Sequence, residues 1–335
     1  AYGEPFMDAI IKDRKALLTA DTLRTLILVL LGAGTVFLFL KKKLSENLTV
    51  IVFAVLLLFD LVSVDRQYVN NDNFTSAIRV DKPYQVNVAD KEILKDKTHF
   101  RVLDMSYEGQ RKPGRAAYFH NSLLGYHAAK LGRYNDLLDF YIYDNNLIVL
   151  NMLNTKYIIV EDDNGIFPYT NTEANGNAWF VSQLQQLKDA NTEIKALDSL
   201  DTKTKAVTTQ SDFSSKPELI TYQLDALATI KLIEFKPNYL KYNSNNLSDG
   251  LAVFSEIYYK NGWNAYMDGE LVPHRRVNYV LRALEIPKGE HTIEFKFEPE
   301  VVETGSKVAL ASSVVFGILF LLGLFYTYRT RKTEF

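Results

Sequence analysis

The sequence predicts a membrane-anchored α+β protein with three transmembrane helices and an outer domain. We expect that domain to combine an α/β unit with a β-sandwich or jelly-roll unit. Two observations lead to this fold class: apolar residues gather in three long blocks, and the polar stretch between the last two carries strand and hairpin patterns. A chain of 335 residues has room for a membrane anchor and one large or two medium domains.

Composition excludes several classes of function. The net charge is −2, so no overall basic field indicates nucleic acid as a partner. The chain has no cysteine, which excludes disulfide scaffolds, cysteine nucleophiles and thiolate metal sites. No phosphate-binding glycine loop or other cofactor motif is present, and we expect neither a cofactor nor a metal.

The three apolar blocks are Leu23–Leu40, Leu48–Val64 and Val308–Tyr328. The third carries no charged residue and is long enough to cross the hydrocarbon core of a bilayer. We therefore expect all three to be transmembrane helices, with membrane lipid as their immediate partner.

Basic residues predict the orientation of these helices. Lys41–Lys43 follow the first block, and Arg329, Arg331 and Lys332 follow the third. Because cytoplasmic loops carry an excess of Lys and Arg, both clusters should be cytoplasmic. Residues 65–306 would then lie outside the membrane of a bacterial cell, anchored in its cytoplasmic (inner) membrane.

Two charged residues fall inside or beside the first two blocks. Arg24 and Asp60 would lie at similar depth in antiparallel helices, where an ion pair would relieve the desolvation of both. The alternatives are that each reaches the headgroups independently, or that they bind a phosphate group at the membrane face.

Local patterns divide the chain further. Pro5 can start a helix with one apolar face before the first block, and Asn70–Asn73 are typical of a linker. The predicted segments are 1–20 (interfacial helix), 21–64 (two transmembrane helices with a cytoplasmic loop), 65–87 (linker), 88–216 (extracytoplasmic α/β domain), 217–305 (extracytoplasmic β-sandwich domain) and 306–335 (transmembrane helix and cytoplasmic tail).

The outer segments show mixed periodicities. Residues 99–103 and 156–160 are predicted strands, and 134–143 and 147–153 are predicted helices between them. In the following segment Val277, Tyr279 and Leu281 recur at every second position, and apolar and polar residues alternate over 292–297; both patterns favour strands. Asp268-Gly269 predicts a hairpin turn.

The densest polar and aromatic stretch covers residues 115–134. A helix starting near Gly125 would place His127, Lys130 and Tyr134 on one face, where they could bind a phosphate or sugar hydroxyls. The alternative is a packed, hydrogen-bonded junction between the outer domain and the membrane anchor. No carboxylate stands at ligand spacing from the histidines, which argues against a metal. The candidate substrate-binding residues here are Tyr118, His120, Tyr126, His127, Lys130 and Arg133.

A second candidate group is Trp263, Tyr266 and Asp268. Aromatic rings that stack on sugar faces, next to a carboxylate for hydroxyls, are typical of carbohydrate binding. Aromatic residues in neighbouring strands are also ordinary cross-strand or core pairs. The sequence contains no recognisable catalytic constellation, so the catalytic residues remain unassigned.

Several stretches together resemble the C-terminal region of YfhO-type bacterial membrane proteins, in particular Bacteroidetes members. The resemblance covers nearly the whole chain. It rests on residues 118–134, 153–159, 176–180, 255–259, 262–263, 268–269, 278–283 and 289–295.

The resemblance implies a polytopic protein similar to glycosyltransferases of the GT-C class. Such an enzyme would take a polyprenyl-phosphate sugar as donor and an envelope glycan as acceptor. Its catalytic carboxylate lies in an early external loop, so we expect the catalytic part in an upstream transmembrane portion of the same protein. The outer domain would position substrate. The alternative is a non-catalytic membrane-tethered module for glycan binding or envelope assembly.

Overall fold

The computed structural model describes residues 4–111, 114–209, 219–223 and 225–331. The chain divides into two compact units, Ala1–Pro83 and Tyr84–Phe335, which are described separately.

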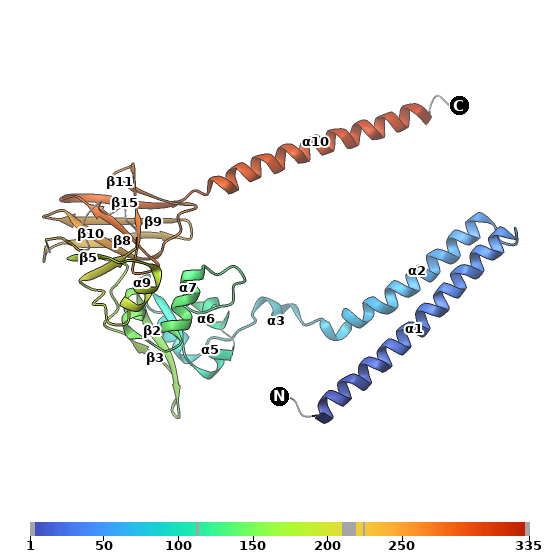
Figure 1. Cartoon of the computed structure of the whole chain (residues 1–335), viewed down its shortest axis with the longest axis horizontal. Coiled ribbons are helices and arrows are strands. Elements are labelled where there is room, and N and C mark those ends of the chain that lie inside the picture. Colours follow the sequence, from blue (N-terminus) through green and yellow to red (C-terminus); the bar gives the residue numbers. More distant parts are fainter. Residues whose placement is uncertain (1–3, 112–113, 210–218, 224, 332–335) are drawn as a thin grey trace. The chain divides into compact units, whose positions relative to one another are not determined.

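The first unit is a helical hairpin (Figure 1). It contains α1 (Glu4–Leu40) and α2 (Glu46–Tyr68), followed by the short helices η1 (Asn71–Asn73) and α3 (Ala77–Asp81). A separate surface helix was expected over residues 1–20, but its described part, residues 4–20, is continuous with the rest of α1. No glycine or proline interrupts the chain between Phe6 and Leu31, so nothing ends the helix before it becomes apolar.

Charged side chains meet where α1 and α2 face each other. Arg24 Nη2 lies 2.9 Å from Asp21 Oδ1 and 3.4 Å from Asp60 Oδ1. Arg24 Nη1 also donates to Ser63 Oγ at 3.4 Å. Arg24 thus has partners on both helices, which reduces the cost of holding a cation in an apolar hairpin.

In the described part of the chain, three helices are long and apolar enough to cross a membrane: α1, α2 and α10 (Glu300–Arg331). The rest of the second unit is rich in β-strands. The predicted fold class, membrane-anchored α+β with three membrane-spanning helices, is confirmed.

The second unit begins with a small α/β arrangement. β1 (Arg101–Asp104) pairs in parallel with β2 (Thr155–Asp162), which pairs antiparallel with β3 (Gly165–Thr170). Helices fill the connection between β1 and β2, as predicted, and a further helix precedes β1. They are α4 (Val88–Ile93), α5 (Tyr107–Arg111), α6 (Gly114–Phe119), α7 (Gly132–Leu137), the π-helical turn η2 (Leu138–Ile142) and α8 (Leu147–Met152).

The remaining strands form three further sheets among the described residues. A four-stranded sheet has the order β13-β14-β10-β4, a five-stranded sheet β12-β11-β15-β9-β8, and a three-stranded sheet β6-β5-β7. Their bounds are β4 (Ala178–Val181), β5 (Gln183–Gln186), α9 (Ala190–Ala196), β6 (Lys205–Thr208), β7 (Leu219–Thr221), β8 (Thr229–Lys236), β9 (Tyr239–Asn246), β10 (Gly250–Ile257), β11 (Trp263–Met267), β12 (Glu270–Val272), β13 (Arg275–Val277), β14 (Leu281–Ile286) and β15 (Gly289–Phe297).

Two cores organise these sheets. One core lies between the four- and five-stranded sheets and contains Tyr242, Phe254 and Phe295, whose rings meet edge to face. A larger core joins residues of the α/β part, such as Leu103, to residues of the four-stranded sheet, such as Val253. Hydrogen bonds between β4 and β10 and this shared core both cross the boundary that sequence analysis placed at 216/217.

One predicted strand is wrong. Val277, Tyr279 and Leu281 are all buried, but the backbone turns between β13 and β14, with positive φ at Asn278 and Tyr279. Asn278 tolerates this conformation because its side chain accepts a hydrogen bond from Val207 N (2.9 Å). The alternation reflected burial of the turn, and not strand geometry. The hairpin predicted at Asp268-Gly269 is confirmed, and both residues have positive φ.

Candidate functional site

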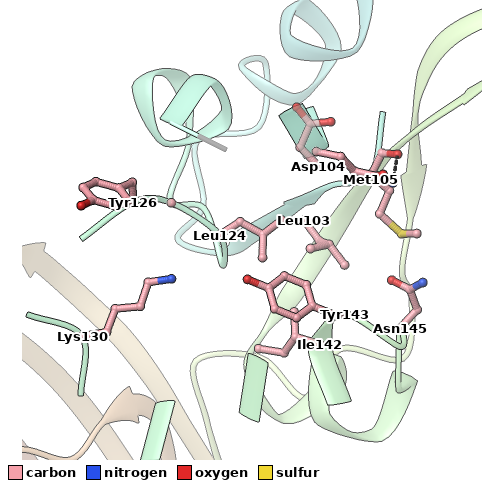
Figure 2. A pocket seen from close by; sticks show the side chains of 11 residues that line it. Leu103, Asp104, Met105, Leu124, Tyr126, Lys130, Ile142, Tyr143 and Asn145 are labelled. Carbon is pink, nitrogen blue, oxygen red and sulfur yellow. Dashed lines mark hydrogen bonds between the residues drawn. The ribbon is translucent and has the colours of Figure 1, made fainter. Parts of the chain in front are cut away.

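A cavity of about 530 Å³ lies beyond the carboxyl end of β1; it is referred to below as the β1 cavity (Figure 2). Ligands of α/β folds bind outside the carboxyl ends of parallel strands, because the loops that leave these ends diverge there. The β1 cavity is lined by Leu103, Asp104, Met105, Gln110, Leu124, Gly125, Tyr126, Lys130, Ile142, Tyr143 and Asn145.

The lining combines an apolar floor with a polar rim. Leu103 and Ile142 belong to the core, so they fix the floor. Lys130 and Tyr143 extend toward each other across the cavity, as Figure 2 shows. Within the described chain, no hydrogen bond or ion pair engages the Lys130 amine or the Tyr143 hydroxyl. Both groups are available to a polar ligand.

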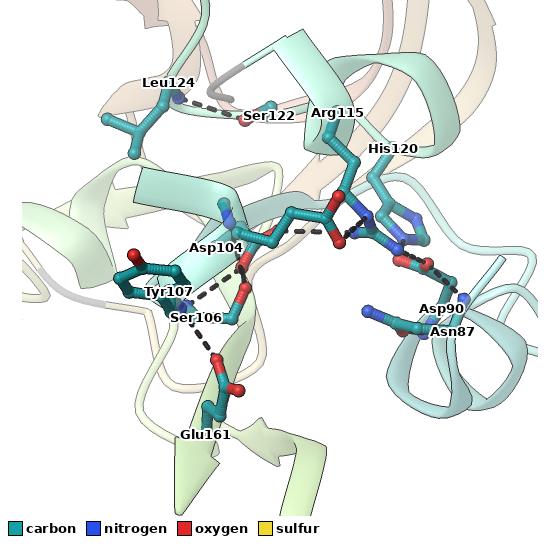
Figure 3. A network of polar contacts seen from close by, with 12 residues as sticks. Asn87, Asp90, Asp104, Ser106, Tyr107, Arg115, His120, Ser122, Leu124 and Glu161 are labelled. Atoms are coloured by element: carbon teal, nitrogen blue, oxygen red, sulfur yellow. Dashed lines mark hydrogen bonds and ion pairs between the residues drawn. The ribbon is translucent and has the colours of Figure 1, made fainter. Parts of the chain in front are cut away.

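Behind the β1 cavity lies a buried polar network (Figure 3). Arg115, which is 2% exposed, forms ion pairs with Asp90 and Asp104. His120 Nε2 lies 2.9 Å from Asp90 Oδ1. Asp104 also accepts hydrogen bonds from the Ser106 hydroxyl (2.6 Å) and backbone N–H (3.1 Å). The network ties the helices α4 and α6 to the end of β1.

The environment of Asp90 keeps that carboxyl charged. Burial raises the pKa of Asp90, but hydrogen bonds from His120, the Asn87 backbone and Arg115, together with the Arg115 charge, outweigh it and lower the pKa below its ordinary value. Asn87 and Asp90 also form a reciprocal capping box at the start of α4.

Gly109 permits the close approach of α5 to Asp104. A Cβ at this position would lie 2.2 Å from the Asp104 carboxyl carbon, so only glycine fits without a shift. The Gly109 N–H donates to Ser106 Oγ (3.1 Å), which in turn donates to Asp104. The side chain that borders the cavity is therefore held from several sides.

The predicted residues of the 115–134 stretch separate into two groups. Tyr126 and Lys130 line the β1 cavity, and both also border a neighbouring surface hollow together with His127. The helix predicted from Gly125 is wrong, because residues 121–131 form an irregular loop. Gly125 has φ +149°, a conformation that ordinary side chains rarely adopt and that lies outside the helical region.

The other three residues of this stretch have structural contacts. His120 is buried against Asp90. Tyr118 is half-exposed and packs edge-on against Tyr84 outside the cavity. Arg133 pairs with the fully buried Glu193 (3.0 Å) and covers the ring of Tyr279. His120 and Arg133 therefore both make ion-pair contacts within the Tyr84–Phe335 unit.

The second candidate group does not share one site. Trp263 lines a separate concavity, while Asp268 lies at a hairpin turn, where it accepts hydrogen bonds from His291 Nδ1 (2.7 Å) and Thr292 N (2.8 Å). Tyr266 donates to Glu298 (2.8 Å). The sequence pattern alone could not show that these three residues lie at different places.

Sequence reasoning missed several residues of these sites. Tyr143 ends a predicted helix and Asn145 lies just beyond it, and neither was predicted to bind a ligand. Asp104 was not predicted as a site residue either. The available signal for Asp104 was its place directly after a predicted strand in a βαβ pattern. Among the described residues, no cluster of three or more His, Asp or Glu could hold a metal ion.

These features define a class of protein: a membrane-anchored α+β protein whose globular part carries a cavity at the end of a parallel strand pair. The comparison with family models is more specific. Residues 214–309, from just before β7 to the first turns of α10, match the family described as "Bacterial membrane protein YfhO". This match confirms the resemblance over that segment and is consistent with a YfhO-type protein. No curated protein and no solved structure matches the chain.

Proposed function

We propose that this chain takes part in lipid-linked sugar transfer at the outer face of the bacterial cytoplasmic membrane, and that the β1 cavity holds a saccharide during that reaction. The donor would be a polyprenyl-phosphate sugar and the acceptor an envelope glycan. The β1 cavity, with Lys130 and Tyr143 facing each other over an apolar floor, is the observation that carries the proposal.

The chemistry of the lining supports a saccharide. A sugar ring has apolar faces and hydroxyl edges, so it suits a floor of Leu103 and Ile142 with donors and acceptors around it. The volume of about 530 Å³ accommodates a ligand of a few sugar rings. The Lys130 amine could also bind an anionic group of a lipid-linked donor.

The acid at this cavity favours binding over catalysis. Asp104 is the one carboxylate among the lining residues, and Ser106 and Arg115 already occupy it. A general base needs hydrogen-bond access to the proton that it removes. The same observation favours a second candidate function, a membrane-tethered glycan-binding or envelope-assembly module without transfer activity.

The transfer experiment uses membranes that contain the native full-length protein. Each preparation receives a set of labelled polyprenyl-phosphate sugars, and release of the lipid carrier is measured. Lys130→Ala or Tyr143→Ala should lower release about tenfold, because each removes a hydrogen bond to the ligand. Lys195→Ala and Tyr169→Ala, which alter exposed residues outside the cavity, are the matched controls.

The possible outcomes separate the two candidates. Carrier release that depends on the cavity residues supports sugar transfer. Saccharide binding without release across a broad donor set would support the tethered module. If neither binding nor release depends on Lys130 and Tyr143, the saccharide proposal is wrong.

The orientation is part of the proposal and has its own test. Ser45→Cys lies in the α1–α2 turn and Asn164→Cys in the exposed β2–β3 hairpin. A membrane-impermeant thiol reagent added to intact cells should label position 164 and leave position 45 unlabelled. Since the natural chain has no cysteine, the background is zero. Reversed labelling would refute the proposed topology.

A further inference from the structure

A second concavity of about 440 Å³ lies at the start of β11; it is referred to below as the Arg282 pocket. Aromatic side chains form much of its wall, and a buried ion cluster forms its base. Its lining residues are Ala129, Leu131, Glu256, Ile257, Tyr259, Trp263, Arg282 and Phe297. All except the first two lie in the segment that matches the family model.

Arg282 is the unusual member of this set. It is the second residue of β14 and is only 2% exposed. Its Nε donates to Ile257 O (3.1 Å), but its buried Nη1 has no hydrogen-bond partner in the described part of the chain. Leaving a buried charged donor without a partner destabilises the folded protein. A ligand that supplies an acceptor would remove this destabilisation.

The charges around Arg282 do not balance it. Glu256 is the neighbouring acid, but Arg101 Nη2 (3.4 Å) and His99 Nε2 (3.3 Å) already contact its carboxylate. Among the described residues no ion pair joins Glu256 to Arg282. The base of the pocket therefore holds two guanidinium groups and one carboxylate, which leaves an excess positive charge.

Protonation does not remove this excess at neutral pH. Burial lowers the pKa of Arg282 to about 10, so the side chain remains a cation. Burial raises the pKa of Glu256, but the Arg101 charge, the His99 hydrogen bond and the Arg282 charge lower it below its ordinary value. Glu256 is thus an anion that Arg101, His99 and Arg282 share, so it compensates the Arg282 charge only in part.

The wall of the pocket fits a ring-shaped ligand. The Arg282 guanidinium carbon lies 4.1 Å from the centre of the Trp263 ring, which packs against Phe297. Tyr259, which is 37% exposed, adds a third aromatic side chain. Aromatic faces next to a planar cation suit a ligand that has both an apolar face and a planar anion.

We infer that the Arg282 pocket is a binding site for a carboxylate-bearing sugar ring, with the carboxylate on the Arg282 guanidinium and the ring face against Trp263 and Tyr259. A carboxylate matches the planar fork of an arginine in a paired arrangement and brings a negative charge that a neutral sugar lacks. This site is separate from the β1 cavity, and its ligand binding does not depend on sugar transfer.

The test measures direct binding to the purified full chain in detergent micelles by isothermal titration calorimetry. The probes are an oligogalacturonide and the neutral galactose oligomer of the same length. The uronate should bind at least about tenfold more tightly, since an interaction with a charged group is gained, and added salt should weaken it. Equal affinities, or no binding of the uronate, would overturn the inference.

Variants separate the site from the fold. Ala129→Trp fills the pocket from an exposed loop position, and Tyr259→Ala removes part of the wall; each should weaken uronate binding at least fivefold. Arg282→Lys keeps the charge but not the fork and should remove most of the preference for uronate. Lys195→Ala, at an exposed position outside both cavities, should leave uronate binding unchanged.

These variants also make failure informative. A thermal melt checks that each one is folded, and Ala129→Trp keeps the test valid if Arg282→Lys does not fold. Unchanged uronate affinity in Ala129→Trp would refute the site. An affinity for inorganic phosphate equal to the affinity for uronate would refute the assignment of a carboxylate ligand. Loss of carrier release with uronate binding intact would refute only the proposed transfer function.

Discussion

Arg115 provides the sharpest test of how the globular unit is held together. The change is Arg115→Met, which keeps the length of the side chain and removes its charge. Arg115 is 2% exposed, and its two principal partners, Asp90 and Asp104, are 0% and 1% exposed. Removing one partner of a buried ion pair costs about 3–5 kcal/mol, because the remaining charge stays buried without compensation. His120 still contacts Asp90, so we expect about 3 kcal/mol.

The assay is urea unfolding of the full chain in detergent micelles, followed by tryptophan fluorescence. Both tryptophans, Trp179 and Trp263, lie in the Tyr84–Phe335 unit, and neither lies in a membrane-spanning helix. The signal therefore reports on the globular part. With a slope of about 3 kcal/mol per molar urea, the midpoint should fall by about 1 M. Arg111→Met, at an exposed position in α5, is the control and should have little effect.

The dependence on pH gives a second check, and its sign follows from Asp90. In the natural protein the pKa of Asp90 is lowered, so its stabilising contribution is present above pH about 3.9 and is lost as pH falls through the folded value. In Arg115→Met the hydrogen bond and charge of Arg115 no longer lower the pKa of Asp90, so this pKa moves upward and acidification from pH 7 toward 4 relieves part of the lost stability. The difference in stability should be largest near pH 7 and should shrink toward pH 4. A loss below 1 kcal/mol at pH 7, or one independent of pH, would refute the reasoning.

Two further substitutions test local geometry. Gly109→Ala should lower the free energy of unfolding by about 2 kcal/mol in the same urea assay, because its Cβ would collide with the Asp104 carboxylate. The control Gly132→Ala has open space around it and should be neutral. Equal effects of the two variants would contradict this packing. Asp268→Asn removes the carboxylate whose hydrogen bond with His291 raises the pKa of that imidazole. The pair therefore stabilises the fold fully below pH about 6.5, and this stabilisation is lost as pH rises through the higher pKa of the folded state. Because Asp268 is half-exposed, the free energy of unfolding of the natural protein should exceed that of the variant by less than about 1 kcal/mol at pH 6, and by almost nothing at pH 9. A larger difference at pH 9 than at pH 6 would contradict the assignment.

The elements that the sequence predicted well are those with strong local signals. The membrane helices follow from long apolar blocks, β2 from a run of β-branched and aromatic residues, and the β11–β12 turn from Asp268-Gly269. Each depends on neighbours along the chain. The helix expected from Gly125 is wrong because spacing alone does not report a positive φ or the packing around a loop.

Long-range contacts explain what sequence reasoning missed. The pairing of β4 with β10 joins residues about seventy positions apart, and no local pattern identifies such a partner. The same holds for Glu193, which is fully buried and accepts hydrogen bonds from Arg133 and the Tyr279 N–H. A charged residue in a short polar helix is expected at the surface, and only the tertiary fold supplies its partners.

Arg115 and Arg282 together show why burial alone does not identify a function. Both arginines are 2% exposed. Arg115 has three carboxylates within ion-pair distance, those of Asp90, Asp104 and Glu108, and holding α4 and α6 to β1 accounts for its burial. Arg282 donates one hydrogen bond to a backbone carbonyl and lies over two aromatic rings. One of its buried nitrogens has no partner in the described chain. A buried cation that its own fold compensates only in part weakens the protein unless a ligand supplies the missing acceptor. The compensated arginine therefore has a structural role, and the partly compensated one, at the base of an aromatic-walled pocket, is where we place a binding site.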